Sequence, residues 1–178
     1  MEHLALSAIG RDRPGIVAAV TRVLLDHGVN VEDSQMTILR RHFTMTLILG
    51  VPDRSNRRVL EQDLHAVAAQ LQLEALSLKG VERLEGDQPE PSHIVTVYGS
   101  DHPGIVCATA EAIARHGYNI TDLNTRLVGD AEGDPLYALM LEVAIPAGHD
   151  EELRSAMADV GRSENVEVTV RELETDEL

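Results

Sequence analysis

Aromatic side chains, cysteine and positive charge are all scarce in this chain of 178 residues. One Phe, three Tyr and no Trp leave the core to aliphatic side chains and provide few stacking platforms for nucleic-acid bases. Only 15 Lys and Arg stand against 30 Asp and Glu, which gives a formal charge of −15, and the Arg residues are scattered along the sequence. Because nucleic acids and anionic membranes reward a basic face, we expect no direct contact with either.

Further absences narrow the class of protein. The single Cys107 excludes an intramolecular disulfide, and the eight His residues show no spacing typical of a metal site, so no metal or cofactor is expected. No apolar run approaches the roughly 18 residues that span a bilayer. The first residues lack the features of a signal peptide, so we expect a cytoplasmic protein. The glycine patterns of nucleotide-binding loops and the serine setting of hydrolases are also missing, and no catalytic residue is assigned.

An internal repeat organises the chain. Residues 10–17 recur as 99–106, a shift of 89 positions, and the motif His-Gly-x-Asn at 27–30 recurs at 116–119. At this shift, 11 of the 29 positions from 10 to 38 are identical. Such self-similarity indicates two copies of one structural unit.

The repeat sets the expected domain boundaries. The two domains should cover 1–85 and 93–173, with an acidic, Pro-rich linker at 86–92 and an acidic tail at 174–178. The second copy is five residues longer, and the extra length falls at 129–135, which is predicted to be a longer hairpin loop.

The hydrophobic periodicity predicts the same order of elements in each copy: strand, helix, strand, strand, helix, strand. The predicted strands are 3–9, 29–40, 43–51 and 73–84 in the first copy, and 93–99, 118–128, 136–145 and 165–173 in the second. The first helices should start at Pro14 and Pro103 and end before Gly28 and Gly117, and the second helices should cover 55–71 and 149–161. This order predicts an α+β protein made of two ferredoxin-like βαββαβ units, each an antiparallel sheet with both helices on one face.

The turn between the first strand and the first helix is the candidate ligand site. Backbone N–H groups at a helix start have no intrahelical acceptor and lie at the positive end of the helix dipole, so they can cradle a carboxylate. The residues assigned to this cradle are Asp12, Pro14, Gly15, Ile16 and Val17 in the first copy, and Asp101, Pro103, Gly104, Ile105 and Val106 in the second.

Asn30 and Asn119 complete the candidate site. Each begins the second strand of its copy, and we expect the sheet to bring each one near the helix start. A side-chain amide can meet both a carboxylate and an ammonium group, so a free α-amino acid is the expected ligand. The alternative interpretation is structural, because helix boundaries alone require the same residue types.

His27 and His116, in the last turn of the first helices, are predicted to cap them rather than to catalyse.

Both halves of the chain resemble ACT domains, which bind amino acids and regulate metabolic enzymes or transcription. The resemblance is carried by Asp12-x-Pro14-Gly15-Ile16-Val17, His27-Gly28-x-Asn30 and Asp33, and by Asp101-x-Pro103-Gly104-Ile105-Val106, His116-Gly117-x-Asn119 and Asp122. A tandem pair of this size is similar to the glycine cleavage system transcriptional repressor group. The resemblance implies a ligand site formed by the first strand–helix loop and the start of the second strand, often where two such domains meet.

The resulting hypothesis is a non-catalytic regulatory protein that senses a small amino acid, with glycine or serine first. Since the chain is acidic, it would act through a protein partner, such as a transcription factor in glycine and one-carbon metabolism. The main alternative is a regulatory subunit of an amino-acid biosynthetic enzyme. The first half is also similar to the regulatory domains of formyltetrahydrofolate deformylases and some phosphoserine phosphatases, whose chemistry resides in a further domain. Small domains with aliphatic strand edges predict pairing of the two units or a homodimer.

Overall fold

The computed structural model describes residues 2–52, 56–82, 89–128 and 136–173. The chain divides into two compact units, Met1–Glu85 (unit 1) and Gly86–Leu178 (unit 2). The expected hairpin insertion at 129–135 and the acidic tail lie outside the described residues, as does part of the linker. None of the helices in the described ranges is long and apolar enough to cross a membrane.

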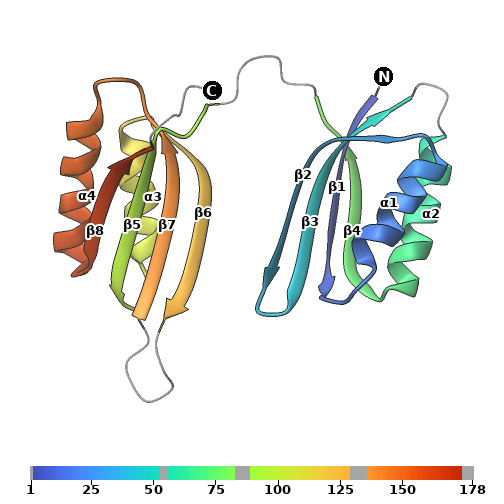
Figure 1. Cartoon of the computed structure of the whole chain (residues 1–178), viewed down its shortest axis with the longest axis horizontal. Helices are drawn as coiled ribbons and strands as arrows, with labels where there is room; N and C mark the ends of the chain where they lie inside the picture. Colours follow the sequence, from blue (N-terminus) through green and yellow to red (C-terminus); the bar gives the residue numbers. More distant parts are fainter. Residues whose placement is uncertain (1, 53–55, 83–88, 129–135, 174–178) are drawn as a thin grey trace. The chain divides into compact units, whose positions relative to one another are not determined.

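Unit 1 contains one antiparallel sheet with strand order β2-β3-β1-β4. Its elements are β1 (Glu2–Arg11), α1 (Ile16–Asp26), β2 (Asn30–Leu39), β3 (His42–Val51), α2 (Arg57–Gln70) and β4 (Leu73–Gly80). Both helices lie on one face of this sheet (Figure 1).

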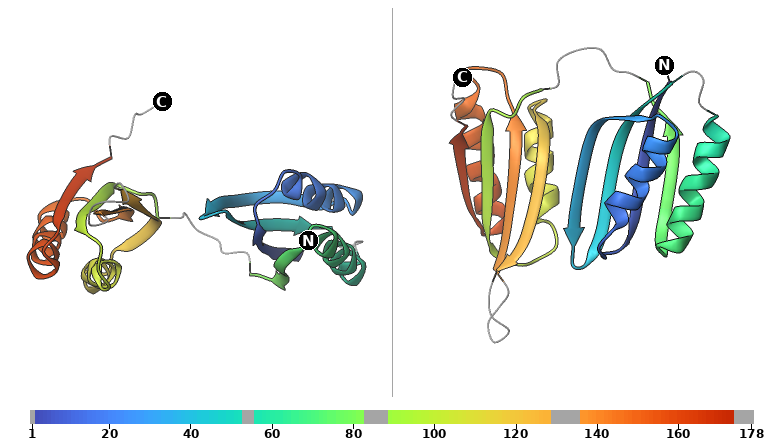
Figure 2. Two further views of the ribbon diagram at one scale, coloured as in Figure 1. Left: turned by 90° about the horizontal axis from the view of Figure 1, so that it is seen from below. Right: turned by 45° about the vertical axis from the view of Figure 1, so that its right-hand side comes forward.

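Unit 2 repeats the arrangement with strand order β6-β7-β5-β8. Its elements are β5 (His93–Ser100), α3 (Ile105–Arg115), β6 (Asn119–Val128), β7 (Leu136–Ala144), α4 (Asp150–Glu164) and β8 (Glu167–Glu172). Figure 2 shows from two further sides that α3 and α4 cover a single face of their sheet. The predicted α+β class with two ferredoxin-like βαββαβ units is confirmed.

Alternation along the strands builds an aliphatic core under the helices. In β1, the side chains of Leu4, Leu6 and Ala8 are buried while those of Ser7 and Ile9 are exposed. The apolar positions of α1 that recur at helical spacing cover this face, as expected of an amphipathic helix. Unit 2 has a separate core of the same kind.

The first helix of each unit begins later than predicted. Pro14 does not occupy the first helical position, because Gly15 follows it as the N-cap residue and α1 starts at Ile16. Pro103 and Gly104 stand in the same relation to α3. The physical reason is that each glycine adopts a left-handed conformation, with φ of 94° and 119°, which turns the chain between strand and helix.

The repeated histidines connect the two helices of each unit. His27 and His116 are the C-cap residues of α1 and α3, as their position in the sequence predicts. In addition, His27 Nε2 lies 2.8 Å from Asp63 Oδ2 on α2, and His116 Nδ1 lies 4.0 Å from Glu152 Oε2 on α4. The repeated His therefore faces a carboxylate of the second helix in both units.

A β-bulge interrupts the second strand of each unit at equivalent positions. The register shifts between Val31 and Asp33 in β2, and between Ile120 and Asp122 in β6. Asp33 Oδ1 accepts a hydrogen bond from the backbone N–H of Ser34 at 2.7 Å. The repeated Asp that follows each bulge thus helps to shape the edge strand.

The packing predicts a clear difference between two neighbouring residues of α2. Leu60 is fully buried, whereas 37% of Val59 is exposed. Leu60→Ala should lower the free energy of unfolding of unit 1 by about 2–5 kcal/mol, because it leaves a cavity in the core. Val59→Ala is the matched control and should cost much less. Urea unfolding followed by circular dichroism measures both, and equal losses would contradict the assigned helix orientation.

Candidate ligand-binding site

The turn between β1 and α1 presents an open helix N-terminus in unit 1. The backbone N–H of Asp12 donates to Arg41 O at 2.9 Å, which holds the turn against the β2–β3 hairpin. Apart from Gly15 itself and its neighbours Pro14 and Ile16, no heavy atom of the described residues lies within 4 Å of the place that a Cβ on Gly15 would occupy. An α-helix leaves its first N–H groups without intrahelical acceptors, and the space beside Gly15, where this helix begins, is open.

The two residues that follow Gly15 differ in exposure. Ile16 is 1% exposed as a whole residue, so its side chain belongs to the core and its N–H is almost covered. The side chain of Val17 is 42% exposed and borders the turn. Ile105 and Val106 divide in the same way in unit 2.

The corresponding turn of unit 2 has a carboxylate at its mouth. A Cβ on Gly104 would lie 3.4 Å from Glu164 Oε2, at the end of α4. A left-handed residue follows the second helix in each unit, Gln72 in unit 1 and Asn165 in unit 2. The residue before it is Leu71 in unit 1 and Glu164 in unit 2. The negative charge of Glu164 opposes the approach of a second carboxylate, so the two cradles are not equivalent.

The residue between Asp and Pro in each turn reaches the end of the second helix. Arg13 Nη2 donates to Gln72 Oε1 at 3.3 Å in unit 1. In unit 2, His102 places Nδ1 3.2 Å from Pro103 O and Nε2 3.0 Å from Glu164 O. Two carbonyl acceptors require both ring nitrogens to donate, which only the protonated imidazole can do. Both carbonyls therefore raise the pKa of His102 above its ordinary value, and the carbonyl of Pro103 contributes more than that of Glu164.

The expectation that Asn30 lies near the helix start is wrong for a single unit. Asn30 pairs with Gly50, which is also the partner of His3, whereas the turn follows Arg11 at the other end of β1. The level of His3 and Asn30 is eight residues along β1 from Arg11, which is about 27 Å. The physical reason is that α1 runs back along the sheet before β2 begins.

Asn119 occupies the equivalent position in unit 2. It pairs with Ala144 beside the start of β5, at the far end from Gly104. A hollow of about 310 Å³ lies next to Asn119 and is also lined by Pro89, Pro91 and Glu142. Each asparagine can therefore meet a helix-start cradle only if that cradle belongs to another unit.

Basic residues gather at the cradle of unit 1, contrary to the scatter of Arg along the sequence. Arg11 pairs with His42 at the end of β1, and Arg40 and Arg41 form the turn directly beyond this pair. Arg13 follows within the strand–helix turn. The β-hairpin register thus brings four guanidinium-bearing residues to the end of unit 1 that carries Gly15.

Within the described residues, no group of three or more His, Cys, Asp or Glu is arranged to hold a metal ion.

Comparison with protein families matches both units to one domain type. Models described as ACT domain match residues 2–76 and 91–171. The glycine cleavage system transcriptional repressor of Escherichia coli is 30% identical over 70% of this chain and 64% of its own length. Phosphoserine phosphatase SerB2 of Mycobacterium tuberculosis is 28% identical over 94% of this chain and 40% of its own length. The chain thus spans less than two thirds of each of these relatives.

Two solved structures share the fold across nearly the whole chain. A protein of unknown function from Galdieria sulphuraria has a TM-score of 0.79 and 24% identity, covering 97% of this chain and 98% of its own. A protein assigned as a glycine cleavage system transcriptional repressor has a TM-score of 0.74 and 20% identity, covering 98% of both chains. At these identities the likeness concerns the fold alone.

The two turns should respond differently to pH. A raised folded-state pKa means that the contribution of His102 to stability is fully present below its unfolded pKa, near the ordinary 6.5. That contribution is lost as pH rises through the folded pKa. His102→Arg supplies the permanent charge that Arg13 has in unit 1, so it should flatten this loss. Urea midpoints measured from pH 5.5 to 8.5 test the prediction, and parallel curves for both proteins would contradict it.

Proposed function

Because the chain belongs to the ACT-domain family and contains two such domains in tandem, we propose that it senses a free amino acid and regulates a protein partner. The open helix N-terminus at Gly15 carries this proposal. It offers unpaired backbone donors, the positive end of a helix dipole and nearby guanidinium groups to a ligand carboxylate. The protein has no catalytic role of its own in this proposal.

Unit 1 is the principal ligand-binding unit. Its cradle is open at Gly15, whereas the cradle of unit 2 has the carboxylate of Glu164 near Gly104. We expect glycine or serine as the ligand. The names of two relatives support this choice, because one is a repressor of a glycine cleavage system and the other is a phosphoserine phosphatase. The arginines near Gly15 make phosphoserine a ligand to test beside them.

A homodimer would complete the site. All ten residues of β2 are exposed, and β2 is an edge strand of its sheet. The apolar side chains of Met36, Ile38 and Leu39 are 48%, 48% and 60% exposed. Antiparallel pairing of β2 with β2 of a second copy is isologous, and it carries Asn30 of one copy to the Leu39 end of the other. That end is the level of the Gly15 cradle, so each site would use both copies.

The regulated partner is a transcription factor in this proposal, and the process is the control of glycine and one-carbon metabolism in the cytoplasm. The match to a named repressor over 70% of this chain supports it. The alternative, a regulatory subunit of a biosynthetic enzyme, has no comparable support. The partner that co-purifies with the chain, a transcription factor or a large catalytic subunit, distinguishes the two.

Ligand binding should depend on Gly15 and much less on Gly104. Calorimetry with glycine, serine and phosphoserine at millimolar concentration should show one site per chain. Gly15→Val should abolish binding, because a β-branched side chain blocks the cradle and strains a positive φ. Gly148→Val is the matched control, since Gly148 also has a positive φ (83°). Beyond its two chain neighbours, no heavy atom in the described part of the chain lies within 4 Å of the place that its Cβ would occupy. Silence across all twenty amino acids and phosphoserine would show that the proposed function is wrong.

The composite site should be recovered by mixing two variants that are each impaired in binding. Asn30→Ala should weaken binding by about 1–3 kcal/mol, the usual cost of leaving a polar group unpaired. A mixed dimer of Gly15→Val and Asn30→Ala chains still contains one site with both native residues. Mixing should therefore restore binding at that one site in each mixed dimer, to the extent that subunits exchange. Ile38→Lys should prevent recovery and yield monomers in sedimentation. Leu25→Lys is the control, because Leu25 is 65% exposed on α1, away from β2. A dimeric Ile38→Lys protein would contradict pairing through β2.

A further inference from the structure

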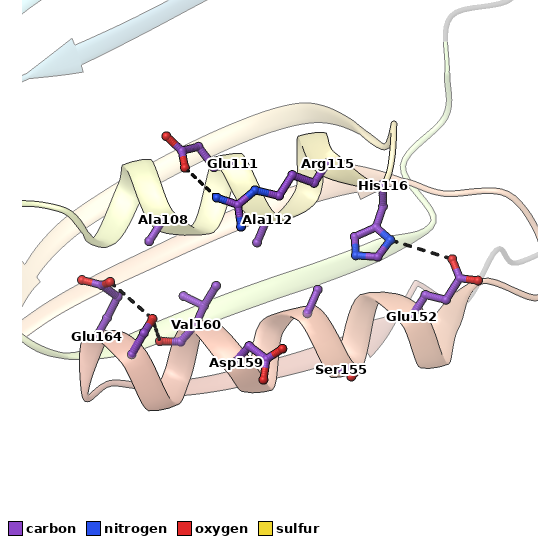
Figure 3. A pocket seen from close by; sticks show the side chains of 12 residues that line it. Ala108, Glu111, Ala112, Arg115, His116, Glu152, Ser155, Asp159, Val160 and Glu164 are labelled. Atoms are coloured by element: carbon purple, nitrogen blue, oxygen red, sulfur yellow. Dashed lines mark hydrogen bonds and ion pairs between the residues drawn. The ribbon is translucent and has the colours of Figure 1, made fainter.

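A groove of about 680 Å³ runs between α3 and α4 on the helical face of unit 2. The two helices are antiparallel, since His116 faces Glu152 at one end and Gly104 faces Glu164 at the other. Figure 3 shows side chains of both helices converging on this groove. It lies on the opposite side of the sheet from the exposed strand face and includes none of the residues assigned to the ligand cradles.

Small residues make the groove. Ala108 and Ala112 line it from α3 and Ala156 lines it from α4, with Val160 beside them. Ala112 and Val160 are buried, and Ala108 and Ala156 are half-buried, so the floor is apolar and reachable. A floor of alanine lets a third helix approach closely, because interaxial distance depends on side-chain size at the contact.

The fold itself does not require so wide a groove. Unit 1 has a hollow of about 260 Å³ at the same place, between α1 and α2. The shift of 89 places Val23 where α3 has Ala112, and alignment of the N-cap residues Asn56 and His149 places Asp63 where α4 has Ala156. The larger residues of unit 1 fill the space that unit 2 leaves open.

The rim of the groove is acidic. Its carboxylates are those of Glu111, Glu152, Asp159 and Glu164, and Arg115 is the one Lys or Arg among the described residues that lines it. Arg115 is engaged with Glu111 at 3.0 Å. Hydrogen bonds from His149 and Tyr118 lower the pKa of Glu152, so this carboxylate is ionised at neutral pH. Asp159 is likewise engaged with Arg162. Four acidic side chains against these two arginines leave a net negative rim around an apolar floor.

We propose that this groove docks a basic amphipathic helix of the regulated partner. An apolar stripe on that helix would cover the alanines, and flanking Lys or Arg would face the rim carboxylates, as in helix-in-groove recognition. From Ala108 to His116 the groove follows α3 for about 12 Å, which is roughly two turns of a docked helix. The proposal rests on the proposed function only in that a regulator needs a surface for its partner.

The charges within this chain argue against a second copy as the occupant. Among the described helices, α1, α2 and α3 each have equal numbers of acidic and basic residues, and α4 is acidic. None of these helices carries the net positive charge that the rim complements. An external basic helix therefore fits the groove better than any helix of the described chain.

A labelled peptide tests the proposal directly. The probe is a fluorescein-labelled helical peptide of Leu, Ala and Lys with Leu at positions i, i+3, i+4 and i+7, measured by anisotropy at 150 mM salt. Ala156→Leu fills the groove and should weaken binding by about tenfold or more. Ala158→Leu is the matched control, because Ala158 is exposed on the same helix outside the groove lining, and it should bind like the native chain.

Further arms separate docking from general charge attraction. A peptide of the same composition with its Leu residues scattered should bind at least about tenfold more weakly than the amphipathic one. Ala108→Leu replaces Ala156→Leu if circular dichroism shows that the latter is unfolded. Absent binding, equal binding of the two peptides, or equal loss in the Ala156 and Ala158 variants would overturn the proposal. Gly15→Val should bind the peptide normally, so failure of the amino-acid site and failure of the groove are distinguishable.

Discussion

Each unit depends on one constraint: the first helix must run back along the first strand before the second strand can begin. This antiparallel return buries the apolar face of α1 against the sheet and brings the β2–β3 hairpin to the end where β1 finishes. The end of α2 arrives there too, as the contact between Arg13 and Gln72 shows. One end of the unit therefore collects a helix N-terminus, a hairpin turn and a helix C-terminus, while the start of β2 is left at the other end.

Much of this architecture follows from the sequence, because it depends on local periodicity and on the repeat. The order of elements, the aliphatic core and the glycines that end α1 and α3 required no long-range information. Asn30 shows where such reasoning stops, since a residue close to a turn in the sequence can be a full strand length away in the sheet. The arginines near Gly15 become neighbours only through the hairpin register. Glu164 reaches Gly104 only through the packing of α4, and no sequence pattern marks that contact.

The two copies share a fold and differ in their surfaces. Unit 1 keeps an open glycine turn among arginines and fills the space between its helices with Val23 and Asp63. Unit 2 places Glu164 beside its glycine turn and leaves an alanine floor between its helices. In the two proposals the units have different roles: unit 1 binds most of the ligand, and unit 2 binds the partner helix. A duplicated unit can diverge in this way because most of these changes lie at exposed or half-buried positions, and the buried change from Val23 to Ala112 keeps an apolar residue in the core.

The β-bulges at the start of β2 and β6 also limit how far another strand could extend these edges. Long, flat strand edges with apolar side chains are templates for uncontrolled growth of a sheet from chain to chain. At each bulge one additional residue breaks the ladder and bends the strand, so an incoming strand can follow β2 in regular register only from Asp33 onward. In the proposed homodimer, two such stretches would pair with each other. A short stretch of this kind also offers less to a growing fibril than a regular edge of all ten residues of β2 would.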